Sequence, residues 1–204
     1  MNPESPNESQ SNTGSPAAVK ISARKSQKVS HRLCQGDILE NIEILEGLDV
    51  VGDKVTVQRV SFPYVVCLNQ ECDLERDFDC IPSHVTDARL LHLAIAPAFL
   101  FEQFLTGKHW GEIFLQARGQ KRADTTIKKI VANEIPRYHY LKFPEADMPE
   151  LIIDFKHFFT INREVAYSQI SKRLGSLDDL FREKINHRFS YYISRIGLPG
   201  EGVD

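Results

Sequence analysis

Three features that the sequence lacks restrict its class before any residue is assigned a role. Residues 1–17 contain no apolar segment of the kind that a secretory signal requires, and no run of about 18 apolar residues occurs in the chain. Cysteine is scarce, with 4 residues among 204, and without an export signal this predicts free thiols rather than disulfides. These absences predict a cytoplasmic protein that has no membrane partner.

The chain also lacks an excess of charge of either sign. Its 25 Lys and Arg residues nearly balance its 28 Asp and Glu residues, so the formal net charge is -3. This balance excludes a nucleic-acid binder that acts through bulk positive charge, although it is compatible with a local basic patch. A hydrophobic fraction of 42% is typical of a globular protein and excludes a collagen, a coiled-coil rod and a fully disordered chain.

The N-terminal segment, residues 1–28, consists largely of Ser, Asn, Pro, Glu and Lys and has almost no large apolar side chain. Such a segment cannot bury enough apolar surface to offset the entropy lost on ordering, so we expect a disordered tail. The basic end of this tail either contacts a partner or only keeps the chain soluble. Residues 29–200 are expected to form a single globular domain of class α+β.

The first half of this domain, about residues 36–96, predicts a small SH3-like β-barrel. Its strand-forming segments are separated by short turns, and the first three form a meander that closes readily into a barrel. We expect these strands at residues 36–45, 55–60, 64–68 and 89–96, with a turn at Gly52-Asp53-Lys54 before the second strand. The charged segment 69–80 predicts a loop or a short capping helix, and Pro97 is expected to end the fourth strand.

The second half predicts a helical insertion over about residues 98–135, followed by strands and a C-terminal helix over residues 136–197. Residues 151–161 alternate like one long strand, which would place His157 on the same face as Ile153. Apolar residues near the C-terminus recur every three or four positions and predict an amphipathic helix. They are Leu177, Phe181, Ile185, Phe189, Tyr192 and Ile196.

A polar cluster at the end of a predicted buried strand, Asn69 to Asp73, is the strongest local signal for a site. Cys72 and Asp73, with His139 supplied from elsewhere in the chain, form a hypothetical catalytic set. Carboxylates beside a thiol disfavour the thiolate, so Cys72 would need such a histidine to become nucleophilic. In the alternative interpretation, Cys72 is a buried small residue beside an aspartate that caps the next turn.

Two further groups of residues have side chains that could bind a metal or transfer a proton. Cys72, Cys80 and His84, with Cys67, could provide four ligands, but the tight C-x2-4-C spacing of structural zinc sites is absent, so we predict neither a metal nor another cofactor. His139, Asp154 and His157 lie on predicted neighbouring strands and could form an acid–base pocket. A core histidine with one satisfied hydrogen bond is the alternative interpretation of His157.

The segment 108–142 holds eight basic residues and only three acidic ones, and it also carries Trp110, Tyr138 and Tyr140. Cations interleaved with aromatic rings suit phosphate backbones and unstacked bases, so this segment predicts contact with RNA or DNA. Alternatively, the cations form a solvated face and the aromatic rings belong to the core. The residues predicted to bind nucleic acid are Lys108, Arg118, Lys121, Arg122, Lys128, Lys129 and Arg137.

Gly36-Asp37-Ile38, a variable hairpin, and then the run from Phe62 to Asn69 resemble the opening of PemK/MazF-like toxins. The resemblance covers about 35 residues and implies an SH3-like barrel, in a family that cuts RNA or binds antitoxins. The family has an arginine and a Ser or Thr where this chain has Phe62 and Asn69. The catalytic positions therefore do not match, although Arg59 could replace the arginine. The resemblance implies the fold of these toxins and not their ribonuclease activity.

These observations leave three hypotheses for the function. The first is a nucleic-acid-associated bacterial protein of toxin–antitoxin or anti-phage defence type. The second is a non-enzymatic interaction subunit of a defence complex, bound to a partner protein from the same operon. The third is a hydrolase or transferase that depends on Cys72. Whether the protein is an enzyme at all stays open at this point.

Overall fold

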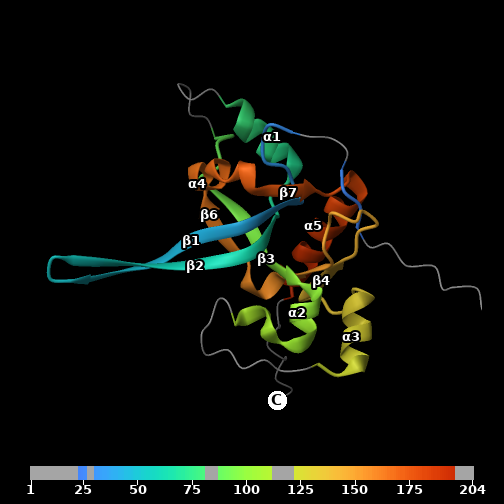
Figure 1. The fold of residues 1–204 in the computed structure, drawn as a ribbon. Coiled ribbons are helices and arrows are strands. Elements are labelled where there is room, and N and C mark those ends of the chain that lie inside the picture. Colours follow the sequence, from blue (N-terminus) through green and yellow to red (C-terminus); the bar gives the residue numbers. More distant parts are fainter. Residues whose placement is uncertain (1–22, 27–29, 81–86, 112–121, 196–204) are drawn as a thin grey trace, which may run out of the picture.

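The computed structural model describes residues 23–26, 30–80, 87–111 and 122–195, and it confirms the α+β class (Figure 1). The strands are β1 (Asp37–Val51), β2 (Lys54–Cys67), β3 (His92–Leu100), β4 (Tyr138–Leu141), β5 (Leu151–Asp154), β6 (Phe159–Asn162) and β7 (Arg173–Ser176). The α-helices are α1 (Glu71–Asp79), α2 (Phe101–Thr106), α3 (Asp124–Val131), α4 (Arg163–Ser168) and α5 (Asp179–Ile193). Short 3-10 turns are η1 (Lys108–Trp110), η2 (Phe155–His157) and η3 (Ile170–Lys172).

The strands of the described residues form one antiparallel sheet that is open, so the predicted closed barrel is not found. Its order is β4-β5-β3-β2-β1-β7, with β6 paired to β3 beside β5. The predicted meander of three short strands is two long strands, because the chain stays extended from Lys54 through to Cys67. The edge next to β1 is taken by β7, which comes from the far end of the sequence.

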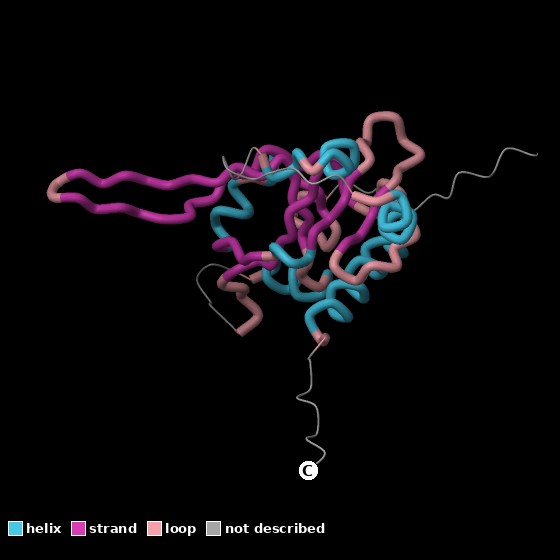
Figure 2. Tube along the Cα trace, turned by 90° about the horizontal axis from the view of Figure 1, so that it is seen from below, coloured by secondary structure: helices cyan, strands magenta, loops and turns pink. Residues whose placement is uncertain are grey.

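The long β1–β2 hairpin projects well beyond the rest of the domain (Figures 1 and 2). Its strands pair from Ile38 opposite Val66 to Val51 opposite Lys54. The predicted turn is confirmed at the tip, where Gly52 has a φ of 58° that favours glycine. Beyond Leu39 of β1 and before Tyr64 of β2, the hairpin has no further strand partner. The core clusters include its residues up to Ile44 and from Val60 onward, and we call the part between them, residues 45–59, the arm.

Pro97 does not end β3, which runs on to Leu100. On one side of β3, β6 pairs with residues 92–95 and β5 pairs with residues 98–100. Pro97 lies in the gap between these two partners, where the missing N–H of proline breaks no ladder hydrogen bond on that side. Proline is thus compatible with a central strand at this one position.

The predicted single strand over residues 151–161 is also wrong, because it is broken by η2. The buried carboxylate of Asp154 accepts a hydrogen bond from the backbone N–H of Lys156 at 3.1 Å and so caps the turn. The turn sends the chain from β5 to β6, which pairs with a different part of β3. His157 therefore does not share a strand face with Ile153.

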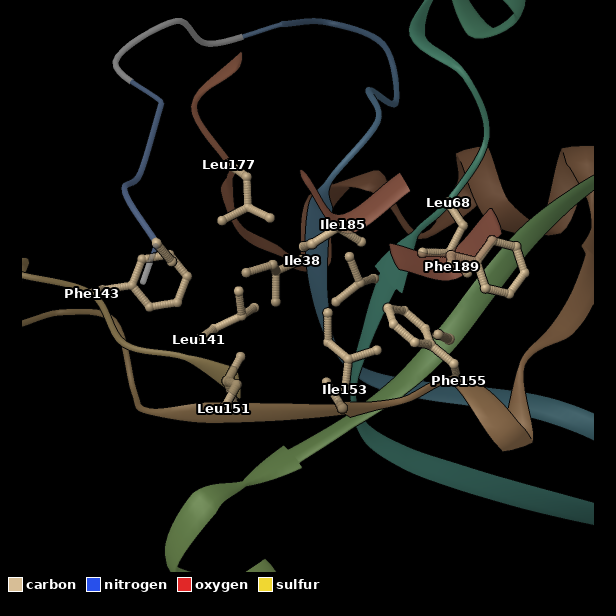
Figure 3. Close-up of a cluster of buried hydrophobic side chains, with 14 of the residues drawn as sticks. Ile38, Leu68, Leu141, Phe143, Leu151, Ile153, Phe155, Leu177, Ile185 and Phe189 are labelled. Carbon is tan, nitrogen blue, oxygen red and sulfur yellow. The ribbon is translucent and has the colours of Figure 1, made fainter. Parts of the chain in front are cut away.

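One face of the sheet is covered by α5, which lies within the predicted C-terminal helix and begins after the N-cap Asp178. Side chains of the strands meet the apolar stripe of this helix in the largest core cluster (Figure 3). Its members from the segment 177–189 are Leu177, Ile185 and Phe189, with Phe181 partly buried against them. The predicted stripe is confirmed as far as Tyr192, whereas Ile196 lies outside the described residues.

The opposite face of the sheet is covered in two places. At one end, Leu74 of α1 and Ala166 of α4 pack on strand residues such as Ile95. At the other end, Phe104 of α2 and Ile130 of α3 pack on Phe99 and its neighbours. Residues 95 and 99 point to the same face because strand side chains alternate. No helix among those described is long and apolar enough to span a membrane.

Part of the segment that we expected to be a disordered tail belongs to the fold. Ala23 is fully buried, and its N–H donates to the Lys142 carbonyl at 3.1 Å. Ser26 donates to the Ser176 carbonyl at 2.7 Å, and the Arg24 carbonyl accepts from the Asp178 N–H at 2.8 Å. These contacts carry no signal in the sequence, because backbone groups and not large apolar side chains make them. The rest of the tail lies outside the described residues.

Deleting residues 1–26 should therefore destabilise the domain by about 3 kcal/mol, because three backbone hydrogen bonds of about 1 kcal/mol each are lost. Deleting residues 1–22 keeps those contacts and should leave the urea midpoint unchanged. Equal midpoints for the two truncated proteins would show that the contacts of residues 23–26 add nothing to stability.

Candidate functional site

The polar cluster of residues 69–73 meets the loop residues 34–37 beside a cleft of about 380 Å³. The backbone N–H of Gln35 donates to Glu71 Oε2 at 2.7 Å, and the N–H of Glu71 donates to Gln35 Oε1 at 3.2 Å. This reciprocal pair joins the start of α1 to the loop before β1. The cleft is lined by polar side chains of the loop, α1 and α5, together with residues 26, 30, 176 and 177.

The charges in this cleft neutralise one another. Glu71 lies between two guanidinium groups, with Arg32 Nη2 at 2.8 Å from Oε1 and Arg182 Nη1 at 3.5 Å from Oε2. Arg32 also approaches Glu75 at 3.7 Å, and Arg182 approaches Asp179 at 3.3 Å. With two cations and three carboxylates engaged, the cleft has no surplus positive charge that would attract an anionic ligand.

A buried carboxylate fixes the loop that borders the cleft. Asp37 accepts a hydrogen bond from the Cys34 N–H at 2.8 Å and one from Arg173 at 3.0 Å, and it also contacts the Ser176 hydroxyl. Burial raises the pKa of Asp37, while these three donors favour its charged form. Asp37, which carries the resemblance to PemK/MazF-like toxins, thus has a structural role here.

The hypothetical catalytic residues Cys72, Asp73 and His139 are not arranged as a catalytic set. Cys72 is exposed, and its Sγ lies 3.7 Å from both Gln70 Oε1 and Asp73 Oδ1, so these neighbours are acceptors and neither is the histidine that the hypothesis requires. His139 is buried in β4, and its Nδ1 finds no hydrogen-bond partner in the part of the chain that the structure describes. The sequence could not reveal this, because burial of His139 depends on α5 covering β4.

The thiol that does line the cleft is Cys34, which the sequence had not indicated as functional. Arg32 Nη1 donates to its Sγ at 3.4 Å, but burial raises the pKa of Cys34, so the neutral thiol is favoured. Among the considered metal ligands, Cys67 is buried in β2 and His84 lies outside the described residues. Within the described part of the chain, no three His, Cys, Asp or Glu residues gather as a metal site would require.

Two members of the predicted acid–base pocket, Asp154 and His157, are brought close, with His157 Nε2 3.9 Å from Asp154 Oδ2. The third, His139, lies opposite Ile153 in the β4–β5 pairing, whereas Tyr138 lies opposite Asp154. Neighbouring strand residues point to opposite faces, so His139 cannot join the pair. Asp154 is instead neutralised by Arg137, whose Nε and Nη2 donate to it at 2.8 and 2.6 Å.

The predicted nucleic-acid-binding residues divide into engaged and exposed cations. Arg137 binds Asp154, and Arg122 donates to the Phe104 carbonyl at 2.6 Å while stacking over the Phe104 ring. Tyr138 and Tyr140 are buried in the core, so the alternative interpretation of these rings is correct. The exposed cations are Lys108, Lys128 and Lys129. Arg118 and Lys121 lie outside the described residues.

The positions at which the chain departs from the toxin family also have structural roles. The ring of Phe62 stacks on Phe159 at 4.9 Å between centroids. The side chain of Asn69 accepts a hydrogen bond from the Ala94 N–H at 2.7 Å and so ties β2 to β3. Arg59 lies on the arm and pairs with Glu43 at 3.4 Å, so it does not replace the family's arginine beside the end of β2.

The arm carries an apolar face that the sequence analysis missed. Leu48 pairs with Val57 and Val50 with Val55, and paired residues share a face. All four side chains are exposed, at 57%, 43%, 67% and 61% respectively. We call these four residues the arm face. Its signal in the sequence is the alternation of Leu48 and Val50, then Val55 and Val57, around the turn at Gly52.

The opposite face of the arm is mostly polar, with Gly47 opposite Gln58, Asp49 opposite Thr56 and Val51 opposite Lys54. A hairpin with one apolar face normally lays that face on a core. Here the core clusters include β1 and β2 residues only up to Ile44 and from Val60 onward. Contiguous apolar surface of this kind is typical of an interaction site.

No known protein family matches the chain, and no curated protein matches it either.

Two buried histidines give the fold a defined dependence on pH. Burial lowers the pKa of His109 to about 4 and, with the nearby Arg188 and Lys184, the pKa of His139 to about 3. Both lie below the ordinary value near 6.5, so the unfolded chain binds more protons than the folded one at mildly acidic pH. Their contribution to stability is complete above about pH 6.5 and is lost as the pH falls.

The free energy of unfolding should accordingly be lower at pH 5 than at pH 7.5, and His109→Phe should reduce this difference. Urea denaturation at the two values measures it. His187→Gln is the matched control, because His187 is exposed on α5. A pH difference that His109→Phe leaves unchanged would contradict the assignment.

Proposed function

We propose that this protein is a non-enzymatic interaction subunit that binds a protein partner through the arm face. The observation that carries the proposal is the row of four exposed apolar side chains on a projecting hairpin. A two-stranded ribbon is marginally stable in water by itself. When a partner covers its apolar face, apolar surface is removed from water, and this burial favours association. Catalysis by Cys72 has no comparable support, because that thiol lies among acceptors.

Photo-cross-linking in cells tests the proposal. A photoreactive residue at Val50 should yield protein adducts, whereas the same residue at the adjacent Asp49 should yield few, because Asp49 lies on the polar face. Mass spectrometry of the adducts identifies the partner. If Val50 yields no protein adduct, or no more than Asp49 does, the arm face is not a binding surface.

A second candidate function is association with RNA or DNA, which we favour less. The exposed Lys108, Lys128 and Lys129 support it, and the resemblance to PemK/MazF-like toxins adds the context of toxin–antitoxin or anti-phage defence systems. The engaged state of Arg122 and Arg137 and the burial of Tyr138 and Tyr140 count against it.

If the lysines of α3 bind phosphate, Lys128→Glu with Lys129→Glu should flatten the plot of log affinity against log salt. The expected change is about 0.7–0.9 for each lost contact, measured with a single-stranded RNA and a duplex DNA. Lys184→Glu, on exposed α5 surface, should leave the slope unchanged. An unmodified protein that binds neither nucleic acid at low salt would exclude this function.

A further inference from the structure

The arm face has a shape and a charge pattern that fit a second copy of itself, and this inference rests on the proposed function. Its two rows, Leu48 with Val57 and Val50 with Val55, contain Leu and Val alone. Two ribbons stacked face to face lie about 10 Å apart, and a two-fold axis lets the same patch serve on both copies. Apolar rows of equal width would then cover each other without burying a polar group.

Charged residues mark the two ends of this face. Arg59 lies at its base, opposite Leu45, and its guanidinium is exposed beside Glu43. Asp53 lies in the turn at the tip. Val55, Val57 and Arg59 follow one another at every second position of β2, so the side chain of Arg59 lies on the same face as the apolar rows.

These charges select one orientation of two stacked arms. In an antiparallel stack, the tip of each arm lies over the base of the other, so Asp53 of one copy approaches Arg59 of the second copy. In a parallel stack, Asp53 would face Asp53 and Arg59 would face Arg59, and like charges would oppose association. We propose that two copies of this chain associate through antiparallel, face-to-face stacking of their arms, with Asp53 paired to Arg59 at both ends.

The composition of the arm disfavours other occupants. Residues 45–59 carry three carboxylates and two cations. This excess of negative charge repels the phosphates of nucleic acids and the headgroups of anionic lipids. A second copy carries the matching cation at the base of its own arm.

The size of the face sets the expected strength of association. The side of the arm that carries this face runs about 20 Å from Leu45 to the turn and is about 10 Å wide, so the arm face covers only part of it. This is small beside standard protein interfaces, so the dimer should be weak and should exchange rapidly. Its detection requires concentrations that extend well into the micromolar range.

Sedimentation equilibrium of the purified full chain tests the inference. The weight-average mass should rise from 23.3 kDa toward twice that value as the concentration increases. Val57→Lys should raise the dissociation constant by about tenfold or more, while Thr56→Lys, on the opposite face, should leave it unchanged. Circular dichroism should show that each variant keeps the fold, because the arm lies outside the core clusters.

A charge exchange tests the orientation. Asp53→Arg and Arg59→Asp should each weaken association, and the double variant should restore it, because the pair then forms with reversed charges. Failure of the double variant to restore it would overturn the antiparallel stack. A chain that stays monomeric at all concentrations would overturn self-association. In that case, Val50 adducts with a different protein would still support the proposed function, and only the identity of the partner would change.

Discussion

Neutralisation of buried carboxylates by arginine is the constraint on which the rest of this structure depends. Among the described residues, three aspartates are completely buried, and each is bound by an arginine from a distant part of the chain. Removing the cation from such a pair costs about 3–5 kcal/mol, because an uncompensated charge is left in the interior. The pairs are Asp37 with Arg173, Asp77 with Arg163, and Asp154 with Arg137.

Each pair fixes a part of the chain that apolar packing would leave free. Arg163 holds α1 against the start of α4 through both oxygens of Asp77, at 2.7 and 2.8 Å. Arg173 binds Asp37 and the carbonyls of Ser30 and Arg32, which sets the loop beside the polar cleft. Arg137 binds Asp154, whose second role is to cap the turn that separates β5 from β6.

The same constraint shapes what the surface offers to partners. Two arginines predicted to bind phosphate are used internally, Arg137 against Asp154 and Arg122 against the carbonyl and ring of Phe104. Engaged cations contribute little to the attraction of a polyanion, whereas the lysines of α3 are exposed to solvent. The apolar face of the arm has no internal partner among the described residues, which makes it the strongest candidate for binding.

The sequence by itself determined the α+β class, the turn at Gly52 and the stripe of α5, while it left the segment after Asn69 open between a loop and a short helix. These features depend on local periodicity and on turn residues, which short stretches of chain express directly. Tertiary structure alone decided that the sheet stays open, that Pro97 lies inside a strand and that Asp154 breaks the strand after it. It also decided that His139 and Cys72 stay apart and that the arm face lies in solvent. These outcomes depend on which distant segment supplies a strand partner or a counter-charge, and residues as far apart as Asp37 and Arg173 carry no local sign of their pairing.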